Sequence, residues 1–202
     1  MVRIYGKQTL SAARRFYEWQ WVLYYDKVWG ENFIWPGILS IIKFLGVKPL
    51  NLTALPNNLR SMQENIRADF NKLSAYCIPA AKHFLREQNG EFYPFGAYID
   101  RKDEIIPSGI YDGDEFPLSD TVIRQFESVF EKWLSSGEIK AYAIAFDSRV
   151  TNDVFPDKID AIATRMRHCD SDDTFVFYFP YKINGNDIQL FESFGEVAPH
   201  KQ

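Results

Sequence analysis

The sequence predicts an α+β protein in which a mostly antiparallel sheet of five or six strands packs with helices. Between Phe92 and Phe194 the apolar pattern reads as a hairpin, one strongly amphipathic helix and four short strands. Strands that follow one another with short polar turns between them favour an antiparallel meander. A helical segment rich in aromatic residues precedes this run.

The first 50 residues differ in composition from the rest of the chain. They contain four of the five tryptophans, and their seven Lys or Arg against three Asp or Glu give a charge of +4. Helical spacing predicts a helix over residues 9–29, and the next apolar run, residues 33–45, is shorter than the roughly 20 residues of a bilayer span. We divide the chain into this aromatic helical segment, residues 1–50, and an α+β sandwich domain, residues 51–202.

Two interpretations of the aromatic segment stay open: a cap that completes the core, and an interface for a protein or a membrane. Tryptophan and tyrosine beside basic residues suit a lipid headgroup region. Glu18, Asp26 and Glu31 interrupt the basic face, and aromatic clusters in soluble proteins are more often packed. Packing is therefore favoured, followed by a protein interface. The side chains expected to contact a partner are Trp29, Trp35, Ile38 and Ile42.

Proline and glycine mark the connector and the first helix of the domain. Residues 46–56 contain two prolines and predict a connector. Apolar residues three or four apart predict a long helix over residues 57–87. We expect Pro79 to kink or divide this helix, because proline lacks the N–H and disfavours helix at the residue before it.

The expected hairpin pairs residues 91–99 with residues 104–111 across a charged turn. Pro94 and Pro107 cannot donate to a strand ladder, so each strand should lie at an edge, break locally, or start after its proline.

The clearest helix begins after Pro117 and ends at Gly137. One wide apolar face is predicted for it, made by Val122, Ile123, Phe126, Val129, Phe130, Trp133 and Leu134. Glu127 and Glu131 are expected on the opposite, solvated face rather than as a paired acid and base.

The strand expected over residues 140–147 is apolar on both faces and should lie inside the sheet. Ala141, Ala143 and Ala145 form one face, whose small side chains would admit a helix at close approach. The opposite face carries large residues, namely Tyr142, Ile144 and Phe146. Further strands are expected over residues 158–168, 174–181 and 187–194.

This order of helix, hairpin, helix and strands resembles the roadblock and profilin-like α/β sandwiches, in which a five-stranded antiparallel sheet lies between helices. The resemblance covers about residues 57–195 and concerns the order of elements, with no shared sequence motif. It implies a binding scaffold by analogy.

The histidines and cysteines show no recognisable catalytic or metal-binding spacing. Cys77 and Cys169 are isolated thiols, which indicates a reducing compartment, and no secretory signal pattern is present, so the expected location is the cytoplasm. Neighbouring residues on a strand point to opposite faces, so His168 and Cys169 are not expected to act as base and nucleophile. Phosphate-loop glycine motifs are absent too, so neither a catalytic residue nor a cofactor is expected.

Acidic turns are the remaining candidates for chemistry. Asp112, Asp114 and Glu115 form a loop that could hold a divalent cation if other oxygen ligands converged there. Such loops more often serve as turns and compensate charge at a helix N-terminus. A second acidic group at residues 170–173 receives the same interpretation. A metal-dependent hydrolase or transferase would use these loops.

The charge of the domain disfavours nucleic acid as a partner. Residues 51–202 hold sixteen basic and twenty-four acidic residues, a net charge of −8 that would repel a phosphate backbone. Arg165 and Arg167 share one strand face and could bind an anion, although protection of an edge strand is the simpler explanation. The expected function is non-enzymatic protein binding, as an adaptor, an immunity-type inhibitor or an assembly subunit. The expected partner is another protein, basic in character, or a second copy of the chain, with peripheral membrane attachment as a further alternative.

Overall fold

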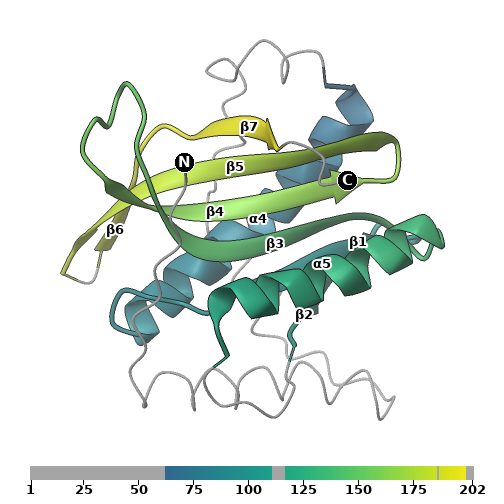
Figure 1. The fold of residues 1–202 in the computed structure, drawn as a ribbon, viewed down its shortest axis with the longest axis horizontal. Coiled ribbons are helices and arrows are strands. Elements are labelled where there is room, and N and C mark those ends of the chain that lie inside the picture. Colours follow the sequence, from purple (N-terminus) through teal and green to yellow (C-terminus); the bar gives the residue numbers. More distant parts are fainter. Residues whose placement is uncertain (1–61, 111–116, 186, 199–202) are drawn as a thin grey trace.

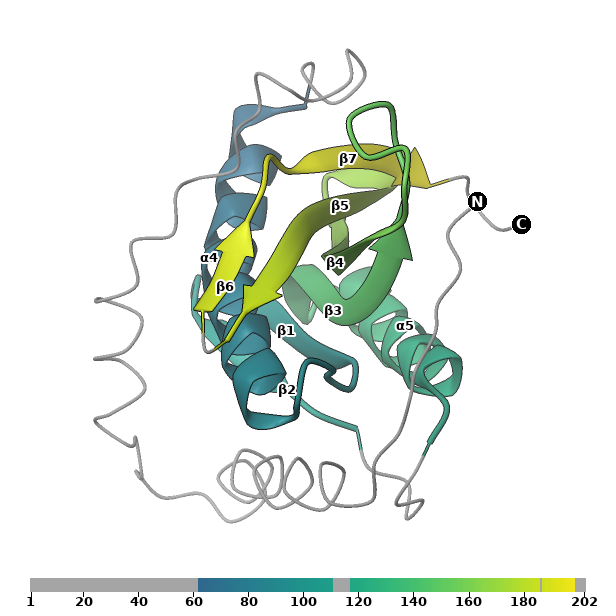
Figure 2. The same cartoon turned by 90° about the vertical axis from the view of Figure 1, so that its left-hand side faces the viewer.

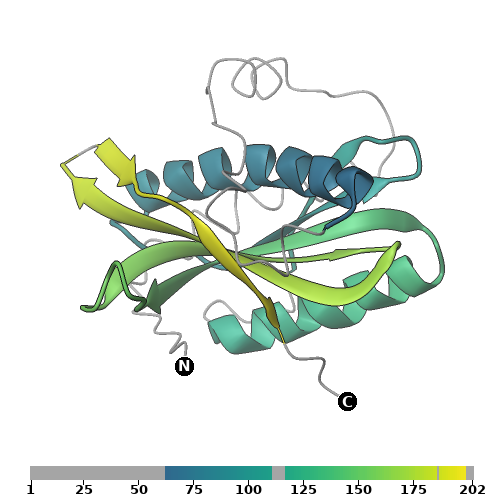
Figure 3. The same ribbon diagram turned by 90° about the horizontal axis from the view of Figure 1, so that it is seen from above.

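A computed structural model describes residues 62–110, 117–185 and 187–198 of the chain. Within these residues an antiparallel sheet of seven strands carries one helix on each face (Figures 1 and 3). The elements are α4 (Glu64–Glu87), β1 (Phe95–Asp100), β2 (Ile105–Ser108), α5 (Ser119–Ser135), β3 (Ile139–Val150), β4 (Ile159–His168), β5 (Ser171–Asn184), β6 (Asp187–Leu190) and β7 (Phe194–Ala198). The predicted α+β class is confirmed, with seven strands in place of five or six.

The strand order across the sheet is β2-β1-β3-β4-β5-β6, and β7 also pairs with β5. The single strand expected over residues 187–194 is therefore wrong, because β6 and β7 are separate strands. Both pair with the same outer edge of β5, whose fourteen residues are long enough for two short partners. Between them Phe191 packs against Phe155 with ring centroids 5.5 Å apart. Figure 2 shows the two strands following one another along β5.

Helix α4 runs through Pro79 in one piece, so of the two expected effects of this proline, a kink or a division of the helix, division is wrong. Phe70 and Leu73 before the proline and Ala81 and Leu85 after it are all buried in the same core. Burial of each large apolar side chain contributes roughly 1.5–3 kcal/mol. Together these contributions exceed the cost of about 3 kcal/mol for a proline inside a helix.

Strand β3 lies between β1 and β4 and is covered on both faces, as its sequence predicted. Ala141, Ala143 and Ala145 are fully buried in the core cluster that contains the apolar side of α4. Tyr142 and Ile144 belong instead to the cluster beneath α5. The alanine face thus receives α4, and the large side chains of the opposite face pack under the second helix.

The prolines of the hairpin occupy the places that the sequence allowed. Strand β1 starts at Phe95, directly after Pro94. Pro107 lies in β2, the edge strand of the sheet, opposite Ala97. In the turn between them the Asp100 side chain accepts hydrogen bonds from the backbone N–H groups of Lys102 and Glu104.

Gly96 lets α5 approach the sheet closely. A Cβ at this position would lie 2.7 Å from Phe130 and 2.8 Å from Phe126, closer than carbon atoms pack. We expect Gly96→Ala to lower the free energy of unfolding by about 1–3 kcal/mol, the usual cost of overpacking, in a urea titration. In a Phe130→Leu background the same change should cost less, and an equal cost in both backgrounds would show that the ring contact is not the cause.

Candidate functional site

Seven of the site residues suggested by the sequence lie outside the residues that the structure describes. They are Trp29, Trp35, Ile38, Ile42, Asp112, Asp114 and Glu115. Their roles stay predictions. Neither of the two described helices has the length and apolarity that crossing a membrane requires.

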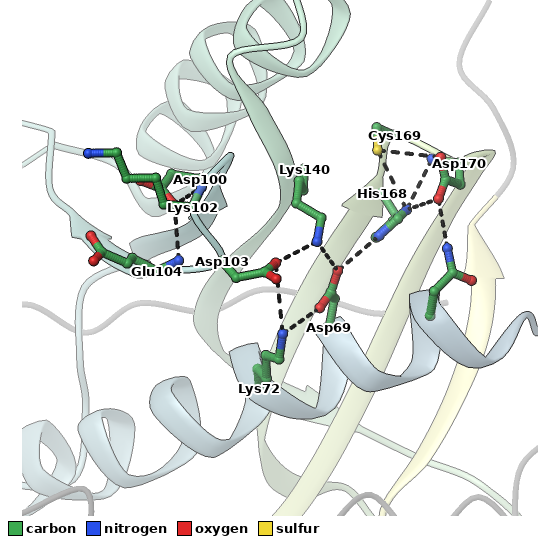
Figure 4. A network of polar contacts seen from close by, with 11 residues as sticks. Asp69, Lys72, Asp100, Lys102, Asp103, Glu104, Lys140, His168, Cys169 and Asp170 are labelled. Atoms are coloured by element: carbon green, nitrogen blue, oxygen red, sulfur yellow. Dashed lines mark hydrogen bonds and ion pairs between the residues drawn. The ribbon is translucent and has the colours of Figure 1, made fainter.

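The densest polar cluster in the described part of the chain surrounds the Asp69 carboxylate on α4 (Figure 4). His168 at the end of β4 places its Nε2 at 3.2 Å from Asp69 Oδ2. The ammonium groups of Lys72 and Lys140 lie 3.0 and 3.5 Å from the same carboxylate. Only 7% of the Asp69 side chain and 1% of the His168 side chain are exposed, so a charge at Asp69 requires partners.

These partners decide the ionisation of Asp69. Burial acts to raise its pKa, but the hydrogen bonds from Lys72 and His168 and the positive charges of Lys72 and Lys140 together lower the pKa below its usual value. Lys140 also bridges to Asp103 in the β1–β2 turn, and this hydrogen bond lowers the pKa of Asp103 and raises that of Lys140. The Asp69 network, formed by these five residues, therefore joins α4 to β3, β4 and the β1–β2 turn.

The β4–β5 turn extends the network toward the surface. The backbone N–H of Asp170 donates to His168 Nδ1 at 3.0 Å, and Asn65 on α4 donates to Asp170 Oδ2 at 2.7 Å. The ionised Asp69 carboxylate can only accept a hydrogen bond, so His168 Nε2 must be the donor. The imidazole therefore carries its proton on Nε2 and a lone pair on Nδ1.

The expectation that Cys169 points away from His168 is wrong. Cys169 lies in the turn after β4, where strand alternation no longer applies, and its Sγ is 3.9 Å from His168 Nδ1. The two side chains nevertheless do not form an activated nucleophile. Nδ1 already accepts the Asp170 N–H, and partial desolvation together with the Asp170 charge raises the pKa of the exposed Cys169 thiol.

A second polar cluster lies on the α4 face of the sheet, at the far ends of β3 and β5. Tyr181 donates its hydroxyl to Asp147 at 3.1 Å, and Arg149 pairs with Asp160 at 2.8 Å. Burial raises the pKa of Asp147 to about 7, and the negative charge of Asp160 adds to this effect. Folding therefore favours the protonated form of this side chain.

On the α5 face of the sheet, the predictions about two glutamates of α5 and two arginines of β4 are wrong. Arg165 pairs with Glu127, and Arg167 lies 3.7 Å from Glu131, which also accepts the Tyr142 hydroxyl at 2.6 Å. The glutamates are thus bound to the sheet rather than merely solvated. Edge protection does not explain the arginines, because β4 lies between β3 and β5 in the interior of the sheet.

The sequence carried a signal for Asp69 that was missed. Asp69 follows Ile66 by three residues and precedes Leu73 by four, which places a carboxylate on the apolar stripe of the helix. His168 likewise shares a strand face with Met166 and Ile162. Ionisable residues on apolar faces require a buried partner, although which residue supplies it depends on the tertiary fold.

The chain matches no family model, and comparisons with curated proteins and with solved structures found no match. The resemblance to roadblock and profilin-like sandwiches accordingly stays a likeness in the order of elements.

Removing the Asp69 carboxylate should destabilise the fold strongly. Asp69→Ala leaves the buried His168 Nε2–H and the Lys140 ammonium without this acceptor, and breaking a buried pair costs about 3–5 kcal/mol. Chemical denaturation measures this cost. Asp103→Ala is the matched control, because it removes the exposed carboxylate of the same network and should cost only a small fraction as much. An equal loss in the free energy of unfolding for both variants would contradict the assignment of Asp69 as the centre of the network.

Asp147 should make stability depend on pH. Its pKa is about 7 in the folded protein, above the value of about 4 for an unfolded aspartate. The folded state thus binds the extra proton between these values, and the free energy of unfolding should fall as pH rises, by up to about 1.4 kcal/mol per pH unit. Asp147→Asn, which keeps an acceptor for Tyr181, should flatten this dependence. The control Asp153→Asn, in an exposed loop, should leave the pH dependence unchanged. Equal pH dependence of the free energy of unfolding in the wild type and both variants would refute the assignment to Asp147.

Proposed function

We propose that the chain is a non-enzymatic protein-binding module in which residues 1–50 contact the partner and the α+β domain is the scaffold. The role would be that of an adaptor, an immunity-type inhibitor or an assembly subunit. The observation that carries the proposal is the concentration of four of the five tryptophans in a segment of charge +4, ahead of a domain of charge −8. Tryptophan is enriched among the residues that dominate binding energy at protein interfaces.

The contacts of the ionisable side chains favour a scaffold over a catalyst. In the described residues His168 donates from Nε2 to Asp69 and accepts the Asp170 N–H at Nδ1, so both nitrogens already have partners within the domain. Arg165 and Arg167 are paired with carboxylates of α5. These contacts connect helices to the sheet, as expected of a rigid body that presents a binding segment.

The charge distribution indicates the chemistry of the partner. A domain of charge −8 attracts a basic protein surface, and the same attraction would operate between the basic segment of one copy and the acidic domain of another. Both associations should weaken as salt rises, because screening shortens the reach of surface charge to about 8 Å at physiological ionic strength.

Deleting residues 1–50 should abolish association and leave a soluble, folded domain. Sedimentation velocity measures self-association, and affinity capture from the native host measures binding of another protein. An insoluble truncated chain would instead indicate that the segment completes the core.

A full-length variant distinguishes loss of contact from loss of fold. Simultaneous substitution of Trp29, Trp35, Ile38 and Ile42 by alanine should weaken association at least tenfold, because interface anchors contribute about 2 kcal/mol or more each. Leu118→Ala and Val154→Ala, which truncate side chains 70% and 74% exposed on the domain, serve as controls and should bind normally. Unchanged binding by the fourfold variant would refute the proposed contact surface.

A further inference from the structure

Three consecutive residues of the β4–β5 turn bring together an imidazole, a thiol and a carboxylate. The ligand atoms of His168, Cys169 and Asp170 all lie within 4.8 Å of one another. Cys169 Sγ is 3.9 Å from His168 Nδ1 and 3.6 Å from Asp170 Oδ1, and the second Asp170 oxygen is 3.8 Å from Nδ1. Figure 4 shows the three groups converging on one side of the turn. Cys169 is exposed, so an ion can reach the group from solvent.

The residues behind the turn hold two of these groups in position for a metal ion. The buried Asp69 carboxylate accepts the Nε2 proton of His168 and so leaves the lone pair on Nδ1, the nitrogen nearest to Cys169 and Asp170. A carboxylate on the far nitrogen of a histidine is the usual outer support of a metal-binding imidazole. Asn65 supports Asp170 in the same way through its hydrogen bond to Oδ2.

We propose that His168 Nδ1, Cys169 Sγ and the Asp170 carboxylate bind a divalent metal ion of the zinc type. Zn²⁺ accepts this mixture of nitrogen, sulfur and oxygen ligands, and a thiolate disfavours Mg²⁺ and Ca²⁺. The thiolate and the carboxylate together neutralise the double charge of the ion. Three protein ligands leave one tetrahedral position for water or for a ligand from another molecule.

Binding requires two local changes at the turn. The ion displaces the N–H of the exposed residue Asp170 from Nδ1, and this N–H can then donate to water instead. The Cys169 S–H bond breaks as the metal–sulfur bond forms, and the proton passes to solvent. The same Nδ1 lone pair that cannot activate the thiol as a base thereby becomes a ligand.

Cobalt substitution tests the site in the full-length chain. Reduced protein titrated with Co²⁺ should bind one equivalent and develop the charge-transfer absorption of a cobalt–thiolate bond, and Zn²⁺ should remove it. Cys169→Ser should abolish the band. Cys77→Ser, the matched change at the buried thiol, should retain it.

Two further variants test the other groups through Zn²⁺ affinity measured by calorimetry. Asp170→Asn weakens a direct ligand and should lower the affinity at least tenfold. Asp69→Asn keeps an acceptor for the imidazole but weakens its support, and should lower affinity roughly 10–100-fold. Circular dichroism establishes that each variant is folded.

Several results would overturn the proposal. A wild-type chain that binds Co²⁺ without a thiolate band, or does not bind it, contradicts the site. A band that persists in Cys169→Ser, or that is lost only in Cys77→Ser, places the ion elsewhere. Unchanged Zn²⁺ affinity in folded Asp170→Asn excludes the carboxylate as a ligand.

Discussion

A buried carboxylate must be compensated, and the arrangement of the domain around α4 depends on how Asp69 meets this requirement. Its partners come from α4 itself, from the start of β3 and from the end of β4. Any shift of the helix along the sheet would separate these groups and leave a charge in the core. A buried ion pair of this kind adds little net stability compared with apolar packing, whereas loss of one partner is strongly destabilising.

Apolar packing sets how closely each helix approaches the sheet, and the two faces of the sheet provide the necessary space in different ways. On the α4 side, β3 offers three alanines, so a helix that carries Phe70 and Leu73 fits against it. On the α5 side, β3 offers large side chains, and Gly96 of β1 provides the space for Phe126 and Phe130. The Asp69 network and the arginine–glutamate pairs then connect the two helices to the sheet.

This construction bears on the proposed role of the protein. In the described residues, His168, Arg165 and Arg167 all pair with groups of the domain itself, in keeping with the proposed scaffold role. The β4–β5 turn differs from the other clusters because its thiol and carboxylate face solvent while its imidazole is anchored in the core. A metal ion held there would connect the surface of the domain directly to the Asp69 network.

Local periodicity was sufficient to identify α5, the hairpin, the interior position of β3 and its alanine face, because each depends on residues close together in the chain. Distant contacts were not accessible in this way. Asp69 and His168 are 99 positions apart. Glu127 of α5 and Arg165 of β4 are 38 positions apart, with β3 between them in the chain. The apolar contacts that keep α4 continuous at Pro79 come from distant strands of the sheet. Residue patterns report which face of an element is apolar, whereas only the folded chain determines which buried polar groups meet.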